Sequence, residues 1–196
     1  MLKIAGLRQL YHTLSGLSLV LIIAYLDKVT DVYLILALFF LSLVIEAARL
    51  YLPGINRIFI KYFGVLMREE ETGNPTGTLY YLSGVLISIL LFPKEIVLLS
   101  MTILAVGDPI AFIVGSNFGR FRIGRKSLEG SLGFLTASII TGFLLHKLWG
   151  NLSGPVIITG ALTGTIVELI PLKINDNLTI PVAASAAMHL ISFYVT

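Results

Sequence analysis

The chain has 196 residues, of which 56% are hydrophobic and 13% are charged, and its mean hydropathy is +0.92. Soluble domains carry about 25% charged residues, so this composition excludes an ordinary soluble globule. The sequence contains no cysteine, which excludes disulfides, thiolate nucleophiles and cysteine-based metal sites. The net charge of +3 is too small to predict nucleic acid as a partner.

Seven apolar segments follow one another along the chain. A helix needs about 20 apolar residues to cross a bilayer, so seven crossings occupy roughly 140 residues and leave no room for a separate soluble domain. We predict an all-α, polytopic membrane protein with about seven transmembrane helices, in which residues 1–196 form one transmembrane domain. The predicted spans are Leu14–Leu26, Val32–Ala48, Leu79–Phe92, Ile96–Phe118, Ser131–Leu148, Gly154–Ile170 and Leu178–Val195.

The segment Ile55–Met67 differs from these seven. It has only 13 residues and carries Arg57 and Lys61, so it is too short and too charged to cross a bilayer. We expect a helix that lies in the membrane interface.

The basic residues predict the orientation of the chain. With seven crossings, Lys28, Lys94 and Lys147 fall on one side, and the other 11 of the 14 fall on the N-terminal side. This asymmetry predicts a cytoplasmic N-terminus in a cell membrane or another intracellular membrane. Most acidic residues are expected on the same side, which favours a site there for a charged substrate and a metal. They are Glu46, Glu69, Glu70, Glu71, Asp108, Glu129, Glu168 and Asp176.

The tripeptide Gly107-Asp108-Pro109 interrupts the longest apolar run. An aspartate at membrane depth costs at least about 2.5–3.5 kcal/mol on insertion scales unless it is paired or faces a polar cavity. Glycine and proline together favour a break in the helix at this point. We interpret Asp108 as a carboxylate that binds Mg²⁺ or acts as a base; the alternative is a structural kink with a buried ion pair.

The segment from Gly115 to Ser131 combines glycines with basic side chains. Glycines let backbone N–H groups approach phosphate oxygens, and arginine or lysine neutralises the phosphate charge. Gly119 to Ser127 nearly matches a P-loop, but Arg125 is one residue too many and an apolar span precedes it, so a P-loop is rejected. We predict a polyphosphate-binding loop, with Ser131 at the start of the next helix; the alternative is a basic turn that only sets topology.

Two acids near the C-terminus are further candidates. Glu168 lies three residues before Pro171 and is a possible second metal ligand facing Asp108, or a surface acid at the end of a span. Asp176 is a possible metal ligand or a helix cap.

Near the N-terminus, Arg8 and His12 lie one turn apart on one helical face. They form a phosphate clamp, or His12 is a hydrogen-bonded histidine at the interface. Glu46 and Arg49 have helical spacing and are interpreted as a simple ion pair.

These motifs resemble the signature of the CTP-dependent lipid kinases, the family of dolichol kinase, phytol kinase and yeast-type diacylglycerol kinase. The central match comprises Gly107-Asp108-Pro109-x-Ala111, Gly115, Gly119 and Gly124-Arg125-Lys126-Ser127-x-Glu129-Gly130-Ser131. Arg8 and His12 resemble the family's N-terminal Arg-Lys-x-x-His element, with Gln9 in place of the usual lysine. Glu168 and Asp176-Asn177-Leu178 resemble its C-terminal acidic elements.

The resemblance implies transfer of the γ-phosphate of CTP to a lipid alcohol, such as dolichol, phytol or diacylglycerol. We assign Mg²⁺ binding to Asp108 with Glu168 or Asp176, and activation of the lipid hydroxyl to Asp108 or Glu129, with Lys126 as a further catalytic residue. The residues assigned to nucleotide binding are Arg8, His12, Gly115, Gly119, Arg122, Arg125, Lys126, Ser127, Gly130 and Ser131.

Two alternatives remain at this stage. The related phosphatidate cytidylyltransferases also use CTP, but their Lys-Asp pair and His-Gly-Gly-x-x-Asp-Arg tail are missing from this sequence. A small transporter can also place an acid at a broken helix. The sequence does not predict the oligomeric state.

Overall fold

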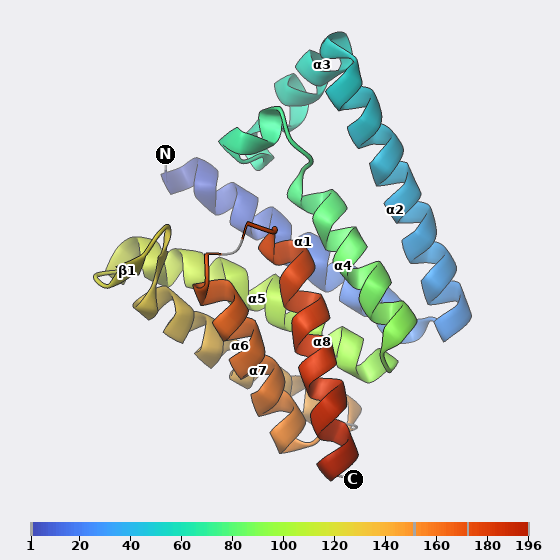
Figure 1. The fold of residues 1–196 in the computed structure, drawn as a ribbon, viewed down its shortest axis with the longest axis vertical. Coiled ribbons are helices and arrows are strands. Elements are labelled where there is room, and N and C mark those ends of the chain that lie inside the picture. The colour runs from blue at the N-terminus through green and yellow to red at the C-terminus, as the bar shows by residue number, and fades with distance from the viewer. Residues whose placement is uncertain (1, 151, 172, 196) are drawn as a thin grey trace.

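The computed structural model describes residues 2–150, 152–171 and 173–195, which form an almost entirely helical bundle (Figure 1). Two single-turn 3-10 helices, η1 (Gly64–Leu66) and η2 (Glu69–Thr72), follow α3, and a two-stranded hairpin, β1 (Arg122–Ile123) and β2 (Lys126–Ser127), joins α5 to α6. The α-helices are α1 (Leu2–Tyr25), α2 (Lys28–Tyr51), α3 (Pro53–Phe63), α4 (Gly77–Leu91), α5 (Lys94–Phe118), α6 (Leu128–Trp149), α7 (Gly154–Leu169) and α8 (Asp176–Val195).

Each of the seven predicted apolar segments coincides with a helix. Among the described residues, α1, α2, α5, α6 and α8 are long and apolar enough to cross a membrane. Helices α4 and α7 are also apolar but have only 15 and 16 residues. The all-α membrane class is therefore confirmed, whereas the number of crossings and the orientation remain predictions.

The predicted interfacial segment is also helical. Residues 55–67 lie in α3 and η1, and α3 turns away from the end of α2 at Pro53 (Figure 1). Proline is favoured at the first position of a helix because its fixed φ suits that position and its missing N–H has no partner there.

Helix α5 forms the centre of the bundle. In its most apolar stretch 78% of the residues are buried, against 17–28% in the other four long helices. It packs against α1, α6, α7 and α8. The approach of α1 depends on Gly16, because a Cβ there would lie 2.7 Å from the Cβ of Ala105 in α5.

The predicted helix break at Gly107-Asp108-Pro109 is wrong, because α5 continues through Pro109 to Phe118. Membrane helices accommodate an internal proline when neighbouring helices and local adjustments compensate for the lost backbone hydrogen bond. The role of Gly107 is close packing, because a Cβ at this position would lie 2.7 Å from the ring of Phe134 in α6. The carboxylate of Asp108 is thereby fixed on a continuous, well-packed helix.

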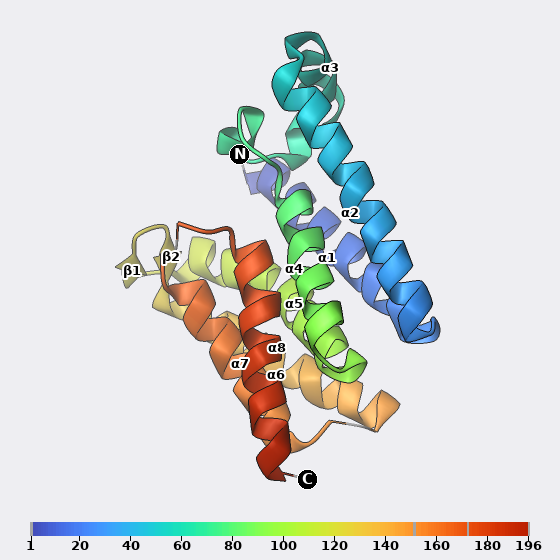
Figure 2. The same cartoon turned by 45° about the vertical axis from the view of Figure 1, so that its right-hand side comes forward.

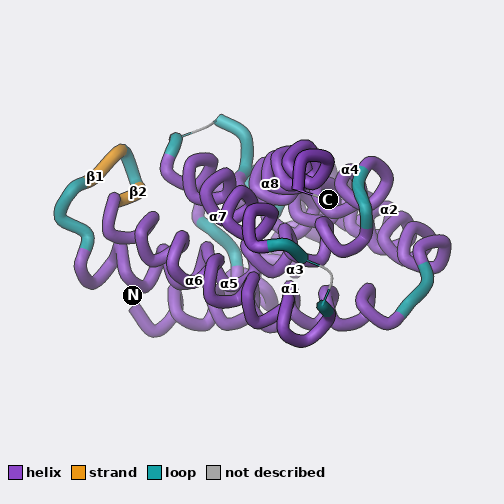
Figure 3. The backbone as a smooth tube through the Cα atoms, turned by 90° about the horizontal axis from the view of Figure 1, so that it is seen from below, coloured by secondary structure: helices purple, strands orange, loops and turns teal. Residues whose placement is uncertain are grey.

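The helices run back and forth so that charged segments gather at one end. The hairpin, η2 and the start of α8 lie toward the same end as the N-terminus, and the C-terminus lies at the opposite end (Figure 2). Figure 3 shows that, in the described chain, strands are confined to this short hairpin. At the far end, Lys94 in α5 forms an ion pair of 2.9 Å with the buried Asp31 in α2.

Candidate active site

A cavity of about 690 Å³ lies at the charged end of the bundle, and we call it the charged cavity. Its walls come from α1, η2, α5, the hairpin, the start of α6, the end of α7 and the start of α8. Five basic and five acidic side chains line it: Arg8, Arg68, Arg122, Arg125 and Lys126, with Glu69, Glu70, Asp108, Glu168 and Asp176. Such a lining suits a highly charged ligand, because each sign of charge finds partners there.

Most of the residues singled out in the sequence come together in this cavity. Those that line it are Arg8, Asp108, Gly115, Arg122, Arg125, Lys126, Ser127, Gly130, Glu168 and Asp176. His12 lines a neighbouring cavity instead, and Gly119, Glu129 and Ser131 are not part of the lining of the charged cavity. The fold thus joins sequence elements that are as far apart as α1 and α8.

Lys126 lies between two carboxylates. Its Nζ atom is 2.7 Å from Oδ2 of Asp176 and 3.0 Å from Oε1 of Glu168. Burial by itself would lower the pKa of Lys126, but the carboxylates of Asp176, Glu168 and Asp108 outweigh it and raise the pKa above its ordinary value. The Lys126 ammonium therefore remains positively charged throughout the neutral pH range and can bind an anion.

The hairpin that carries Lys126 was not predicted from the sequence. Ile123 pairs with Lys126, so the turn consists of Gly124 and Arg125 alone. Gly124 has a φ of +61°, a conformation that glycine adopts without steric cost, and a positive φ at the first turn position favours glycine in two-residue hairpins. The sequence signal was this isolated glycine between short polar runs. At the tip, Arg125 forms an exposed ion pair of 3.1 Å with Glu70.

Ser127, not Ser131, caps α6, so that prediction is wrong. The helix begins at Leu128, and the Ser127 Oγ accepts a hydrogen bond of 3.1 Å from the Gly130 N–H. Ser131 already lies inside the helix, where its hydroxyl donates to Oε2 of Glu168 at 2.6 Å. Glu168 is therefore held between Ser131 and Lys126.

The glycines of this segment allow close packing around Ser127. A Cβ at Gly115 would lie 2.9 Å from the Ser127 Oγ, and one at Gly119 would lie 2.8 Å from it. A Cβ at Gly130 would lie 2.8 Å from the carbonyl oxygen of Ala111. The end of α5 and the start of α6 can approach this closely only without side chains at these positions.

Glu129 is half-buried at the base of the hairpin. Its carboxylate accepts a hydrogen bond of 3.2 Å from the Phe121 N–H and so ties the hairpin to α6. Of the two carboxylates predicted to activate the lipid hydroxyl, Asp108 is the one that lines the cavity.

The start of α8 leaves Asp176 available to the cavity. The Asn175 side chain accepts a hydrogen bond of 3.0 Å from the Asn177 N–H, which is the contact a helix cap makes. Asp176 was expected to be a cap or a site residue, and its carboxylate contacts Lys126 instead of a cap donor.

Asp108 differs from most of its acidic neighbours. Its carboxylate and that of Glu69 form no hydrogen bond or ion pair with the residues that the structure describes, whereas Glu70, Glu168 and Asp176 are each paired. Asp108 also lines a second cavity of about 500 Å³, and Arg8, Gln9 and Arg68 line both cavities with it. An unengaged carboxylate thus lies at the boundary between two cavities.

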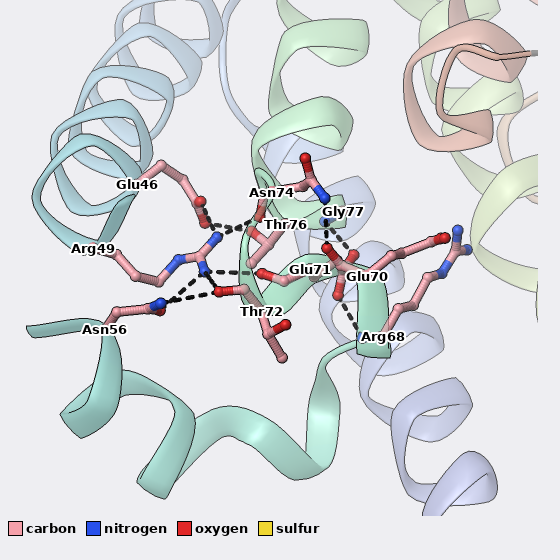
Figure 4. A network of polar contacts seen from close by, with 10 residues as sticks. All are labelled: Glu46, Arg49, Asn56, Arg68, Glu70, Glu71, Thr72, Asn74, Thr76 and Gly77. Carbon is pink, nitrogen blue, oxygen red and sulfur yellow. Dashed lines mark hydrogen bonds and ion pairs between the residues drawn. The ribbon is translucent and has the colours of Figure 1, made fainter. Parts of the chain in front are cut away.

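Glu46 and Arg49, predicted to form a simple ion pair, belong to a larger buried network that holds the loop after η1. Arg49 is completely buried, and its Nη2 lies 2.5 Å from Oε2 of Glu46 (Figure 4). The guanidinium also donates to the carbonyl oxygens of Glu71 and Asn74 at 2.9 and 2.6 Å. Thr76 donates to the second oxygen of Glu46 at 2.7 Å. We call residues 68–77 the anchored loop.

Glu71 also stabilises the anchored loop, through hydrogen bonds to its backbone. Its two carboxylate oxygens accept hydrogen bonds from the N–H groups of Arg68 and Gly77, at 2.7 and 2.8 Å (Figure 4). This fixes the backbone on both sides of Glu69 and Glu70, so that Arg68, Glu69 and Glu70 are positioned along the charged cavity.

Among the described residues, no group of three or more His, Asp or Glu side chains is arranged to hold a metal ion. Lys126 lies between two of the three predicted ligands, Glu168 and Asp176. The assignment of Asp108, Glu168 and Asp176 to a metal remains a prediction.

Comparison with known proteins finds relatives with a named activity. The chain is 29% identical over 164 residues to CTP-dependent diacylglycerol kinase 1 of Schizosaccharomyces pombe, covering 74% of each chain. It is 25% identical over 209 residues to the Saccharomyces cerevisiae protein of the same name, covering 94% of this chain and 72% of that one. It is 30% identical over 206 residues to phytol kinase 1, chloroplastic, of Arabidopsis thaliana, covering 93% of this chain and 65% of that one.

These similarities support the family of CTP-dependent lipid kinases. The matches extend over most of the chain and agree with the resemblance of its motifs. No family model and no solved structure matches the chain.

Proposed function

We propose that this protein is an integral-membrane kinase that transfers the γ-phosphate of CTP to a lipid alcohol, such as diacylglycerol, a phytol-type alcohol or a polyprenol. The names of its relatives supply the donor and the class of acceptor. The observation that carries the proposal is the position of Asp108, an unengaged carboxylate between the charged cavity and a second, more apolar cavity.

The charged cavity binds the triphosphate of the donor in this proposal. Arg122, Arg125 and Lys126 come from one hairpin, and Arg8 and Arg68 face them from α1 and the anchored loop. Phosphoryl transfer requires positioning and neutralisation of charge on the transferred group more than covalent chemistry. Lys126 is suited to this role, because its present partners Glu168 and Asp176 hold it in the cavity until a phosphate replaces one of them.

Asp108 accepts the proton of the acceptor. The alcohol oxygen attacks the γ-phosphorus, the bond from the γ-phosphorus to the bridging oxygen breaks, and CDP leaves with that oxygen. The hydroxyl proton passes to the carboxylate of Asp108. A positioned general base of this kind contributes about 10²- to 10⁴-fold to the rate.

Mg²⁺ is the metal that this chemistry implies. It prefers oxygen ligands and is usually bound by one or two carboxylates together with the phosphates of the substrate. Asp108 fits this donor set because its carboxylate forms no hydrogen bond or ion pair with a described side chain, and Glu168 and Asp176 would join it once Lys126 contacts phosphate. Bound there, Mg²⁺ would neutralise charge on the phosphates.

We propose further that seven helices cross the membrane and that the charged end faces the cytoplasm. The excess of basic residues on the N-terminal side supports this orientation. Because the chain lacks cysteine, single cysteines placed at the exposed Lys28 and Gly73 should react with an impermeant reagent from opposite sides, Gly73 from the cytoplasm. Reaction of both from one side would contradict the seven-crossing topology.

The activity is tested with purified protein in detergent. CTP carrying a labelled γ-phosphate is supplied with Mg²⁺ and, in turn, dioleoylglycerol, phytol or a polyprenol. The proposal expects label in a phosphorylated alcohol, dependent on the alcohol and lost in Asp108→Asn. Formation of a CDP-lipid with pyrophosphate would indicate a cytidylyltransferase, and consumption of no CTP with any alcohol would reject the kinase.

A further inference from the structure

The second cavity, of about 500 Å³, lies beside the charged cavity and has mainly apolar walls. Its apolar lining comes from α1, α2, α3 and α4 and includes Leu19, Ile22, Leu38, Phe59, Phe63 and Leu82. The outer faces of the same helices are also apolar: Leu21 in α1 is 54% exposed and Ile58 in α3 is 60% exposed. A molecule dissolved in the bilayer can therefore contact apolar side chains on the helices that form this cavity.

The inner end of this cavity is polar and unsatisfied. The His12 Nε2 and the Tyr81 hydroxyl are buried and have no hydrogen-bond partner in the described part of the chain. Both side chains line the cavity, and their rings are in edge contact with centroids 6.3 Å apart. Buried polar atoms are nearly always paired, so two such atoms in one cavity indicate a ligand with a polar group at this end.

The position of Asp108 gives this polar end its chemistry. Asp108 lines the second cavity together with His12 and Tyr81, and it lines the charged cavity as well. A hydroxyl group bound by His12 and Tyr81 therefore lies in the same cavity as a carboxylate that also lines the charged cavity. The walls of this cavity are mainly apolar, which suits a hydrocarbon chain better than a nucleotide base.

We infer that the second cavity is the acceptor site and that it binds the hydroxyl end of a long-chain lipid alcohol. His12 and Tyr81 bind the hydroxyl group beside Asp108, and the hydrocarbon chain follows α1 past Ile22. This inference rests on the proposed kinase function. It moves His12 from the phosphate clamp expected from the sequence to the acceptor, and it adds Tyr81, which the sequence analysis did not single out.

Two neighbouring residues of α1 provide a matched test. Ile22 lines the cavity and is 49% exposed, whereas Leu21 does not line it and is 54% exposed. Ile22→Trp should fill the path of the chain and raise KM for dioleoylglycerol or phytol by about tenfold or more, whereas KM for CTP stays unchanged. Leu21→Trp adds the same bulk outside the cavity and should change neither constant.

Tyr81→Phe tests the polar end without changing shape. It should raise KM for the alcohol by about 2- to 12-fold, the effect of one lost neutral hydrogen bond, and leave KM for CTP unchanged. The thermal unfolding midpoint of each variant in detergent verifies that it folds. Equal KM values for the alcohol in Ile22→Trp, Leu21→Trp and the parent protein would overturn the acceptor site.

A binding measurement separates this inference from the kinase proposal. A long-chain alcohol that carries a diazirine is photolysed with the protein in the absence of CTP, and the labelled peptides are mapped. The inference expects labelling of α1, α2, α3 and α4 that excess phytol competes away and that Ile22→Trp reduces. Labelling elsewhere would overturn it, even in an active kinase. If the protein transfers no phosphate, labelling at these helices still supports an alcohol site while the kinase proposal fails.

Discussion

Two clusters of charged side chains lie at the same end of this molecule and differ in the groups that pair with them. Arg49 and Glu46 are buried, and their partners are each other, the carbonyl oxygens of the anchored loop and Thr76 (Figure 4). Lys126, Glu168 and Asp176 line a cavity, and the Lys126 side chain remains 26% exposed. The first cluster is completed by the chain itself, whereas the second is accessible to a ligand.

This difference distinguishes a cluster that stabilises the fold from a cluster that can bind a ligand. A buried ion pair is expensive to assemble and is strongly destabilising when one partner is removed, so its residues hold backbone in place. A partly exposed pair exchanges partners at lower cost, because the groups keep some contact with water. Sequence spacing alone does not distinguish the two, since both consist of basic and acidic residues at the same end of the bundle.

The largest effect should follow from removing the charge of Asp108. Asp108→Asn keeps the size of the side chain, and the loss of the base should lower kcat by about 10²- to 10⁴-fold. The change should leave the unfolding midpoint in detergent near that of the parent, because no described residue pairs with this carboxylate. Activity within about tenfold of the parent would assign Asp108 to structure.

The next effect concerns the buried cluster. Arg49→Met leaves Glu46 as an uncompensated buried charge and releases the anchored loop, so the free energy of unfolding should fall by about 3–5 kcal/mol. Unfolding in a denaturing detergent measures this loss, and limited proteolysis should cleave between residues 68 and 77. The control Arg57→Met changes a basic residue of α3 outside this network and should be nearly neutral. An uncleaved loop in Arg49→Met would show that the network does not hold it.

A substitution in the accessible cluster of Lys126, Glu168 and Asp176 should change ligand binding rather than the stability of the fold. Lys126→Ala removes one charge-assisted phosphate contact, so KM for CTP should rise by about 10- to 150-fold, equivalent to about 1.5–3 kcal/mol. KM for the alcohol should stay near the parental value. Lys147→Ala, at the opposite end of α6, serves as the control. Unchanged KM for CTP and unchanged kcat in Lys126→Ala would remove the phosphate role from this loop.

The smallest effect tests the start of α6. Ser127→Ala removes the cap of the helix and should lower the free energy of unfolding by about 0.5–2 kcal/mol. Thr136→Ala changes an exposed hydroxyl within the same helix and should have a smaller effect. Equal losses in the two variants would show that the Ser127 hydroxyl contributes nothing beyond an ordinary surface position.

The helices of this protein were largely determined by its sequence. Apolar runs interrupted by glycine, proline and charge predicted all seven apolar helices and the short helix after α2, because a membrane helix must satisfy its own backbone and present apolar side chains. Most of the cavity lining was also predictable, because an acid inside an apolar run and a loop of glycines and basic residues are costly without a polar environment. The family resemblance agreed with both.

Only the tertiary structure decided how these residues meet. Pro109 leaves α5 unbroken because neighbouring helices hold it, and Ser127 rather than Ser131 caps α6 because a hairpin turn at Gly124 brings it there. The pairing of Lys126 with two carboxylates and the separation of His12 from the charged cavity join segments distant in the chain. Local sequence cannot determine such contacts, because they depend on which helix faces pack together.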